Sequence, residues 1–244
     1  MTKTGRRWLL GIGAAYLLAL HAALVLSFDR QDLNPLLRRA GLRPIPAPEF
    51  DRFHASMRAM LRRVDSVAGP GRVVFLGAST LHGLDAAAVA PDALNLAIGG
   101  DTTLRLLTRL GDYRSLPTAS AVVLLVGLND LTYRTPEEAG ELFGRILERL
   151  PPVPLVAGAV LPVDEAAAWP RNADIRRLNA AIRAHCARRP DCVFVDPGPQ
   201  LADAAGNLAP RFRQHDGIHL TAEGYRVLIG ALREGLASAR GRPS

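Results

Sequence analysis

From residue 72 onward, short continuous apolar runs alternate with longer stretches in which apolar residues recur at helical spacing. The amphipathic stretch that starts near residue 136 follows "TPEE" (135–138), which has the form of a capping box. Strands that are apolar throughout and alternate with helices are typical of a parallel sheet covered on both faces. We therefore predict an α/β fold, a small doubly wound, flavodoxin-like sheet of five parallel strands. The strands are expected at 73–76, 94–98, 121–126, 154–160 and 193–195, and the helices at 102–113, 136–150, 171–187 and 221–237.

Residues 8–28 form a different pattern, an apolar run that contains no Asp, Glu, Lys or Arg. As a helix, this run would rise about 31 Å, which matches the hydrocarbon thickness of a bilayer. Lys3, Arg6 and Arg7 precede it, and this order predicts a transmembrane helix with a cytoplasmic N-terminus and an extracytoplasmic domain. A cleaved signal peptide has the same order of charges with a shorter apolar core, so secretion is the alternative.

These patterns divide the chain into three parts. Residues 1–28 are the expected membrane anchor or signal peptide, residues 29–71 a linker rich in proline and arginine that ends in a helix, and residues 72–244 the α/β domain. The net charge of +7 is concentrated outside that domain, because residues 1–72 hold 12 basic and 5 acidic residues. Since the remainder carries 18 of each, we expect no nucleic-acid partner.

Cys186 and Cys192 lie where a predicted helix ends and a predicted strand begins. An oxidising compartment would allow a local disulfide at this position. Two unpaired small residues fit the sequence equally well, because the geometry of a bridge cannot be derived from spacing. The sequence leaves both alternatives open.

Four motifs follow or precede the predicted strands and helices at the edge where active sites of such sheets form: "GAST" (77–80), "NLAIGGDTT" (95–103), "GLND" (127–130) and "DGIH" (216–219). The hydroxyl of Ser79 is a weak nucleophile without a base, and His219, oriented by Asp216, can serve as that base. The backbone N–H of Gly100 and the side-chain amide of Asn129 can stabilise an oxyanion together with the Ser79 N–H. Each motif alone fits a turn or a helix cap, whereas all four together predict an acyl-transfer site.

The chain from about residue 72 to 238 resembles the SGNH (GDSL-type) hydrolases. The segments "NLAIGGDTTLRLLTRL" and "VVLLVGLND" are most similar to the branch of platelet-activating-factor acetylhydrolases and lysophospholipase/thioesterases. The resemblance implies that Ser79 is the nucleophile, that Gly100 and Asn129 are oxyanion donors, and that Asp216 and His219 complete the triad. One departure is Ala78, because the family usually has Asp between the glycine and the serine.

We therefore expect a serine esterase that hydrolyses short-acyl, lipid or acetylated-glycan esters through an acyl-enzyme, without a cofactor or metal. Transfer of the acyl group to an envelope glycan, or deacetylation of that glycan, is the first alternative and uses the same triad. A non-catalytic protein that binds glycan or lipid is the second. We interpret two other histidines as bystanders: His82 is expected to face solvent, and His54 to lie on the surface of a helix.

Overall fold

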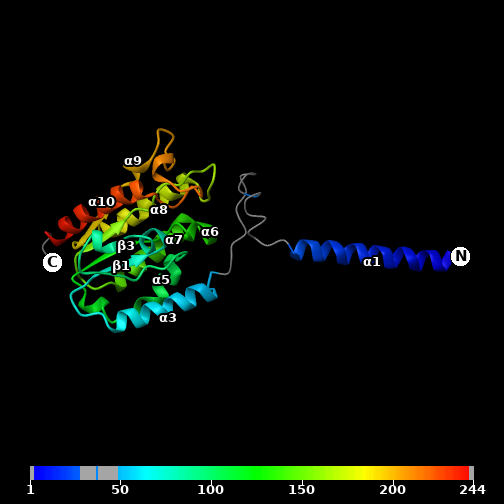
Figure 1. Ribbon diagram of the computed structural model, residues 1–244, viewed down its shortest axis with the longest axis horizontal. Helices are drawn as coiled ribbons and strands as arrows, with labels where there is room; N and C mark the ends of the chain where they lie inside the picture. Colours follow the sequence, from blue (N-terminus) through cyan, green and yellow to red (C-terminus); the bar gives the residue numbers. More distant parts are fainter. Residues whose placement is uncertain (1–2, 28–36, 38–48, 242–244) are drawn as a thin grey trace. The chain divides into compact units, whose positions relative to one another are not determined.

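The computed structural model describes residues 3–27, 37 and 49–241, with the side chains of the first helix described for residues 11–23. The chain forms two compact units, Met1–Ala47 and Pro48–Ser244. The first unit contains helix α1 (Lys3–Ser27), drawn in blue in Figure 1. Among the helices and side chains described, none combines the length and the apolar character that crossing a membrane requires. Part of the transmembrane helix expected at residues 8–28 lies outside the described side chains, which cover residues 11–23 of that span.

The second unit is built on a sheet of five parallel strands in the order β2-β1-β3-β4-β5. The strands are β1 (Val73–Gly77), β2 (Ala93–Asn95), β3 (Ala121–Leu125), β4 (Leu155–Gly158) and β5 (Cys192–Val195). The α/β fold predicted from the alternating pattern, with five parallel strands, is confirmed. The strand order reverses direction between β1 and β3, and ligands of open α/β sheets bind beyond the carboxyl ends of the strands at such a point.

Helices cover both faces of the sheet (Figure 1). Alternate residues of β1 enter different cores: Val74 and Leu76 belong to one, Val73 and Phe75 to the other, as the two-residue period of a strand requires. The first core is completed by α3 (Arg52–Ser66), α5 (Thr103–Arg109), α7 (Pro136–Arg149) and α8 (Asn172–Cys186), and the second by α10 (Ala222–Arg240). Shorter elements are α4 (Ser79–His82), α6 (Asp130–Tyr133), α9 (Gly198–Leu201), η1 (Ala86–Ala88), η2 (Leu110–Asp112), η3 (Leu116–Thr118) and η4 (Pro210–Phe212).

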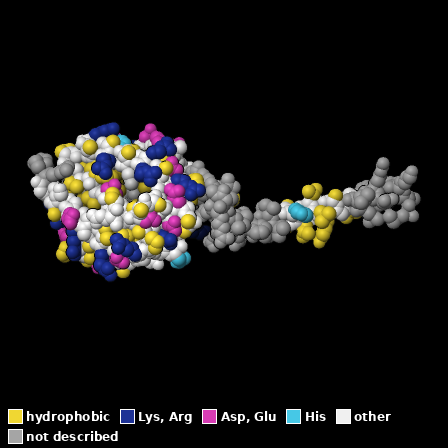
Figure 2. All heavy atoms as spheres, turned by 90° about the horizontal axis from the view of Figure 1, so that it is seen from above, with side chains coloured by type: hydrophobic (Ala, Val, Ile, Leu, Met, Phe, Trp, Pro, Cys, Tyr) yellow, Lys and Arg dark blue, Asp and Glu magenta, His cyan; other side chains and the backbone are white. Residues whose placement is uncertain are grey.

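One local prediction, and one question that the sequence left open, have a definite outcome. The capping box at the start of α7 is confirmed, because the Thr135 hydroxyl accepts from the Glu138 N–H at 3.2 Å and the Glu138 carboxylate accepts from the Thr135 N–H at 2.8 Å. Cys186 and Cys192 form a disulfide, which ties the end of α8 to the start of β5. On the face shown in Figure 2, the basic and acidic side chains of the larger unit are interspersed, as the balanced charge of residues 73–244 predicts.

Candidate active site

The loops that carry the four motifs meet at the carboxyl edge of the sheet. Ser79 follows β1, Gly100 lies in the loop after β2, and Asn129 follows β3. Asp216 and His219 lie in the loop that leads into α10. Ser79 and Asn129 line the same small pocket, whose other walls include Ile218 from the α10 loop.

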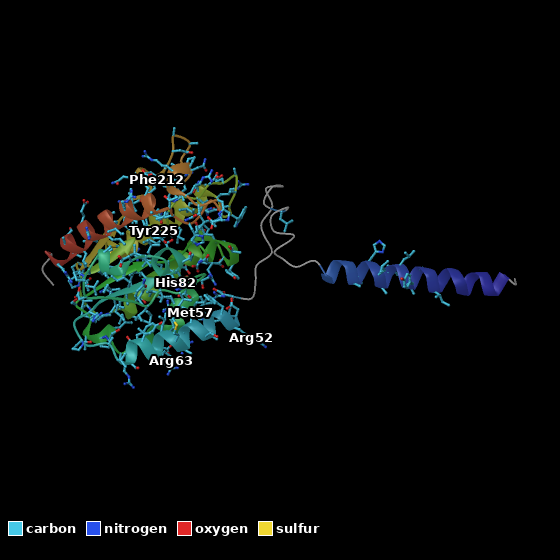
Figure 3. The ribbon with its side chains drawn as sticks, in the orientation of Figure 1. Arg52, Met57, Arg63, His82, Phe212 and Tyr225 are labelled. Carbon is cyan, nitrogen blue, oxygen red and sulfur yellow. A yellow bond between two sulfur atoms is a disulfide. The ribbon has the colours of Figure 1, made fainter. Side chains whose placement is uncertain are left out.

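Ser79 occupies the first position of α4, a helix of one turn. Its amide N–H therefore has no acceptor within the helix and is available to a ligand. Ala78, at the cap position, is buried and provides no side-chain hydrogen bond to the helix. Two other side chains hold α4 instead: the Asn95 amide donates to the Leu81 carbonyl at 2.7 Å, and Tyr225 of α10 donates to the Thr80 carbonyl at 3.1 Å (Figure 3).

The imidazole of His219 connects Ser79 to Asp216. Its Nε2 lies 3.0 Å from the Ser79 Oγ, and its Nδ1 lies 2.5 Å from an Asp216 carboxylate oxygen. With the Nδ1 proton directed at Asp216, the Nε2 lone pair faces the Ser79 hydroxyl. The arrangement therefore allows His219 to accept the proton of Ser79.

Asp216 is kept ionised by the loop that surrounds it. Burial alone would raise the pKa of the Asp216 carboxyl, but hydrogen bonds from the His219 ring, the His219 N–H and the Ile218 N–H outweigh burial. Together they lower the pKa of Asp216 to about 2. Gly217 makes this tight loop possible, because its φ of 75° is a conformation that residues with a Cβ rarely adopt.

Gly100 lies in an exposed turn that neighbouring side chains hold in place. Its φ is also 75°, and its carbonyl accepts from Arg105 Nη1 at 3.0 Å. The preceding N–H, that of Gly99, donates to His82 Nδ1 at 3.0 Å, so the helix that carries Ser79 is hydrogen-bonded to the Gly99–Gly100 turn. His82 is exposed, as predicted, but it has a structural function that the sequence analysis missed.

Asn129 links the third loop to the second. One hydrogen of its amide is donated to the Asp101 carbonyl at 2.9 Å, which leaves the other for a ligand. The Asp101 carboxylate is fully buried and accepts from Arg109, which is also fully buried, at 2.6 and 2.9 Å. The expectation that His54 is a surface residue is wrong: His54 is 3% exposed and its Nε2 lies 3.4 Å from Asp101, because α3 packs that face against the domain.

A short segment before α3 clamps the same two loops from outside. Glu49 accepts from the Thr102 hydroxyl at 2.6 Å and from Arg134 Nη2 at 2.7 Å through each carboxylate oxygen. Asp51 pairs with Arg105, the residue that holds the Gly100 carbonyl, at 3.2 Å. The loops of both predicted oxyanion donors are therefore fixed by residues that lie before the first strand.

The spacing of Asp101, Arg105 and Arg109 is a signal that could have identified this network. Residues four apart lie on one face of a helix, and both arginines do contact the loop that precedes α5: Arg105 binds the Gly100 carbonyl and Arg109 binds Asp101. Glu49 and Asp51 gave no comparable signal, because their partners are more than 50 residues away in the sequence. Among the described residues, no group of three or more His, Cys, Asp or Glu side chains could hold a metal ion.

Comparison with known proteins identifies the class to which this fold and site belong. The model of the GDSL-like lipase/acylhydrolase family matches residues 67–227, and the chain belongs to this family of hydrolytic enzymes. Platelet-activating factor acetylhydrolase IB subunit alpha1 of Bos taurus is 30% identical over 145 residues, which are 57% of this chain and 61% of the bovine protein. The chain thus spans less than two thirds of that relative.

Two solved structures share the fold. A protein of Streptococcus pneumonia named for platelet activating factor superposes with a TM-score of 0.69 and 22% identity, over 76% of this chain and 93% of its own. A GDSL-like lipase of Bacteroides thetaiotaomicron gives a TM-score of 0.60 and 23% identity, over 76% of this chain and 99% of its own. Membership of a hydrolase family does not favour the alternative of a non-catalytic protein that binds glycan or lipid. The functions of individual residues are predictions.

Proposed function

We propose that this chain is a serine esterase in which Ser79 is the nucleophile, His219 the general base and Asp216 the residue that orients it. The observation that carries this proposal is the continuous hydrogen-bonded path from the Ser79 Oγ through the His219 ring to Asp216, with distances of 3.0 and 2.5 Å. A hydroxyl activated by a base, with the base oriented by a third group, is the arrangement that nucleophilic acyl transfer requires.

In the proposed reaction, Ser79 Oγ attacks the ester carbonyl while its proton passes to His219 Nε2. The N–H groups of Ser79 and Gly100 and the free hydrogen of the Asn129 amide stabilise the resulting oxyanion. The C–O bond to the alcohol then breaks, and the alcohol leaves with the proton from His219. Water, deprotonated by His219, attacks the acyl-enzyme in the same way and releases the acid and free Ser79.

We propose further that the acyl group is short. The pocket beside Ser79 has room of about 20 Å³ and is lined by the apolar residues Val160, Leu161 and Val163. A space of this size accommodates a group of about the size of a water molecule or methyl. The bovine relative is named as an acetylhydrolase, which also supports an acetyl group.

We propose an extracytoplasmic location for the larger unit. The disulfide between Cys186 and Cys192 supports it, because such bonds persist in oxidising compartments and are rare in the cytosol. The apolar run at 8–28 and the basic residues before it, read as an export signal, support the same location.

A panel of p-nitrophenyl esters of increasing acyl length tests the reaction and the acyl preference together. Ser79→Ala is expected to abolish acetate hydrolysis and labelling by a fluorophosphonate, whereas Ser238→Ala, which removes an exposed hydroxyl on α10, leaves both unchanged. In the wild type, kcat/KM is expected to fall by about tenfold for each methylene that the pocket cannot hold. Full turnover by Ser79→Ala would exclude the mechanism, and a preference for octanoate would exclude only the short acyl group.

A further inference from the structure

Helix α3 exposes a line of apolar side chains. Residues 53, 60 and 64 recur at the seven- and four-residue spacing of one face of α3, while residue 50 lies just before the helix and residue 67 is its C-cap. Among the described residues from 49 onward, every large hydrophobic side chain that is exposed lies in this line. They are Phe50 (52% exposed), Phe53 (53%), Met60 (39%), Val64 (41%) and Val67 (85%).

This line is not the face with which α3 packs against the domain. His54, Leu61 and Asp65 form that face and are buried. Between the two faces, Met57 is partly buried and packs against the core (Figure 3). Exposed apolar side chains gathered on one element, rather than scattered singly, indicate a surface that contacts another phase or molecule.

The charges beside the line are basic. Arg52, Arg62 and Arg63 are exposed on α3, and Arg52 and Arg63 fall on the same side of the apolar line by helical spacing. The nearby acidic residues are already engaged: Asp51 with Arg105, Asp112 with Arg58, and Asp65 with the backbone N–H groups of Arg114 and Ser115. The exposed charge on α3 that is left for a partner is therefore positive.

The positive charge distinguishes between two partners that could cover the apolar line, a second copy of this chain and a phospholipid surface. If α3 packed against α3 of a second copy, exposed arginines would face arginines, and like charges in contact oppose association. A phospholipid surface with anionic headgroups complements both features, because it takes apolar side chains at the acyl boundary and arginines at the phosphates.

We propose that the α3 outer face, defined as Phe50, Phe53, Met60, Val64 and Val67 with Arg52 and Arg63, binds the surface of an anionic phospholipid bilayer. The helix lies in the plane of the interface, with its apolar side chains in the headgroup region. A side-chain carbon built on Gly99 would lie 4.0 Å from the ring of Phe53, so the line begins beside the turn that carries Gly100. Binding through this face holds that edge of the site close to the lipid surface. The proposal concerns α3 alone and does not depend on the reaction proposed for Ser79.

An environment-sensitive probe on α3 tests this in the full-length chain. Both cysteines of the sequence form the disulfide, so Val64→Cys introduces a single thiol for the fluorophore NBD. Ser238→Cys is the matched control, because position 238 is exposed on α10, which packs on the other face of the sheet from α3. We expect vesicles of phosphatidylcholine and phosphatidylglycerol in equal parts to shift the emission at position 64 to the blue, whereas vesicles of phosphatidylcholine alone do not. The control position is not expected to respond to either.

Charge variants test the contribution of the arginines. Arg52→Gln with Arg63→Gln is expected to weaken the response at position 64 by about fivefold per arginine, or about 25-fold in total, which corresponds to about 1 kcal/mol for each. Arg226→Gln with Arg240→Gln removes the same charge from exposed positions of α10 and is expected to change little. Equal losses in both pairs, an equal response in neutral vesicles or at position 238, or no response at 64 would overturn the proposal. A blue shift that appears without vesicles when the protein concentration is raised would show that a second copy of the chain covers this face, and it would also overturn the proposal.

Discussion

Asp216 carries its charge throughout the pH range in which an esterase can be assayed, because hydrogen bonds from His219 and Ile218 outweigh the effect of burial and lower its pKa to about 2. The acidic limb of a pH–rate profile well above pH 2 therefore reports another group. The lowered pKa of Asp216 also stabilises the folded state at every pH above the ordinary pKa of an aspartate, about 4. This contribution to the free energy of unfolding is lost as the pH falls from about 4 to 2.

Asp216→Asn is expected to lower kcat for p-nitrophenyl acetate by about 10²–10⁴-fold with little change in KM, because the amide no longer holds the His219 tautomer or stabilises the imidazolium. Steady-state kinetics with p-nitrophenyl acetate measure kcat and KM separately.

The control for this variant is Asp203→Asn. The Asp203 carboxylate accepts from the N–H groups of Ala205 and Asn207, both at 2.9 Å, much as Asp216 accepts from its own turn, but no histidine is among these partners. Its kcat is expected to stay at the wild-type value. If Asp216→Asn kept the same kcat as this control, Asp216 would not belong to the triad.

At the scale of elements, the segment before α3 and the loops of the predicted oxyanion donors form one hydrogen-bonded network. Glu49 bridges Thr102, at the start of α5, to Arg134, which follows α6. Arg134 also pairs with the buried carboxylate of Asp130, the residue after Asn129. Residues before the part of the chain that matches the family thus fix the loops on which the oxyanion would depend.

Glu49→Ala is expected to lower kcat by about 10–100-fold at unchanged KM, because the oxyanion donors lose their fixed positions while ester binding in the ground state does not depend on them. Glu49→Gln keeps an acceptor for Thr102 and is expected to recover part of the loss. Glu137→Ala removes the carboxylate of another Glu–Arg pair, the exposed one with Arg177 at 2.8 Å, and serves as the control with unchanged kinetics. A matching rise in KM, or no change in kcat, would contradict a positioning function.

The sequence analysis predicted the elements that its patterns determine and missed contacts made at long range. Continuous apolar runs were sufficient to predict all five strands. The four motifs were sufficient to predict that Ser79 and His219 lie close together, and the Ser79 Oγ is 3.0 Å from the His219 Nε2. The burial of His54 could not be predicted, because its helix has apolar residues on an exposed face as well as on the packed one. The clamp of Glu49 was missed for a related reason: a linker that looks polar and proline-rich gives no local pattern for its distant partners.

At the scale of the whole molecule, the disulfide and the predicted active site lie at opposite ends of the sheet. Cys192 begins β5, whereas Ser79 follows the carboxyl end of β1. The bond closes a short loop, since its two cysteines are only six positions apart. In the chain-entropy description, a loop of this length stabilises the folded state by about 2 kcal/mol.

We therefore expect reduction to separate stability from activity. Cys186→Ser with Cys192→Ser, or the wild type in a thiol reductant, is expected to lose about 2 kcal/mol of unfolding free energy in urea titrations, with kcat on p-nitrophenyl acetate unchanged. The reductant is not expected to change the free energy of unfolding of the double variant. That result would show that the reductant acts on the wild type through this one disulfide. Protein recovered from its own compartment should contain no thiol that alkylates before reduction. Free thiols in that material would contradict the proposed extracytoplasmic location, and a loss of kcat on reduction would show that the two ends of the sheet are coupled.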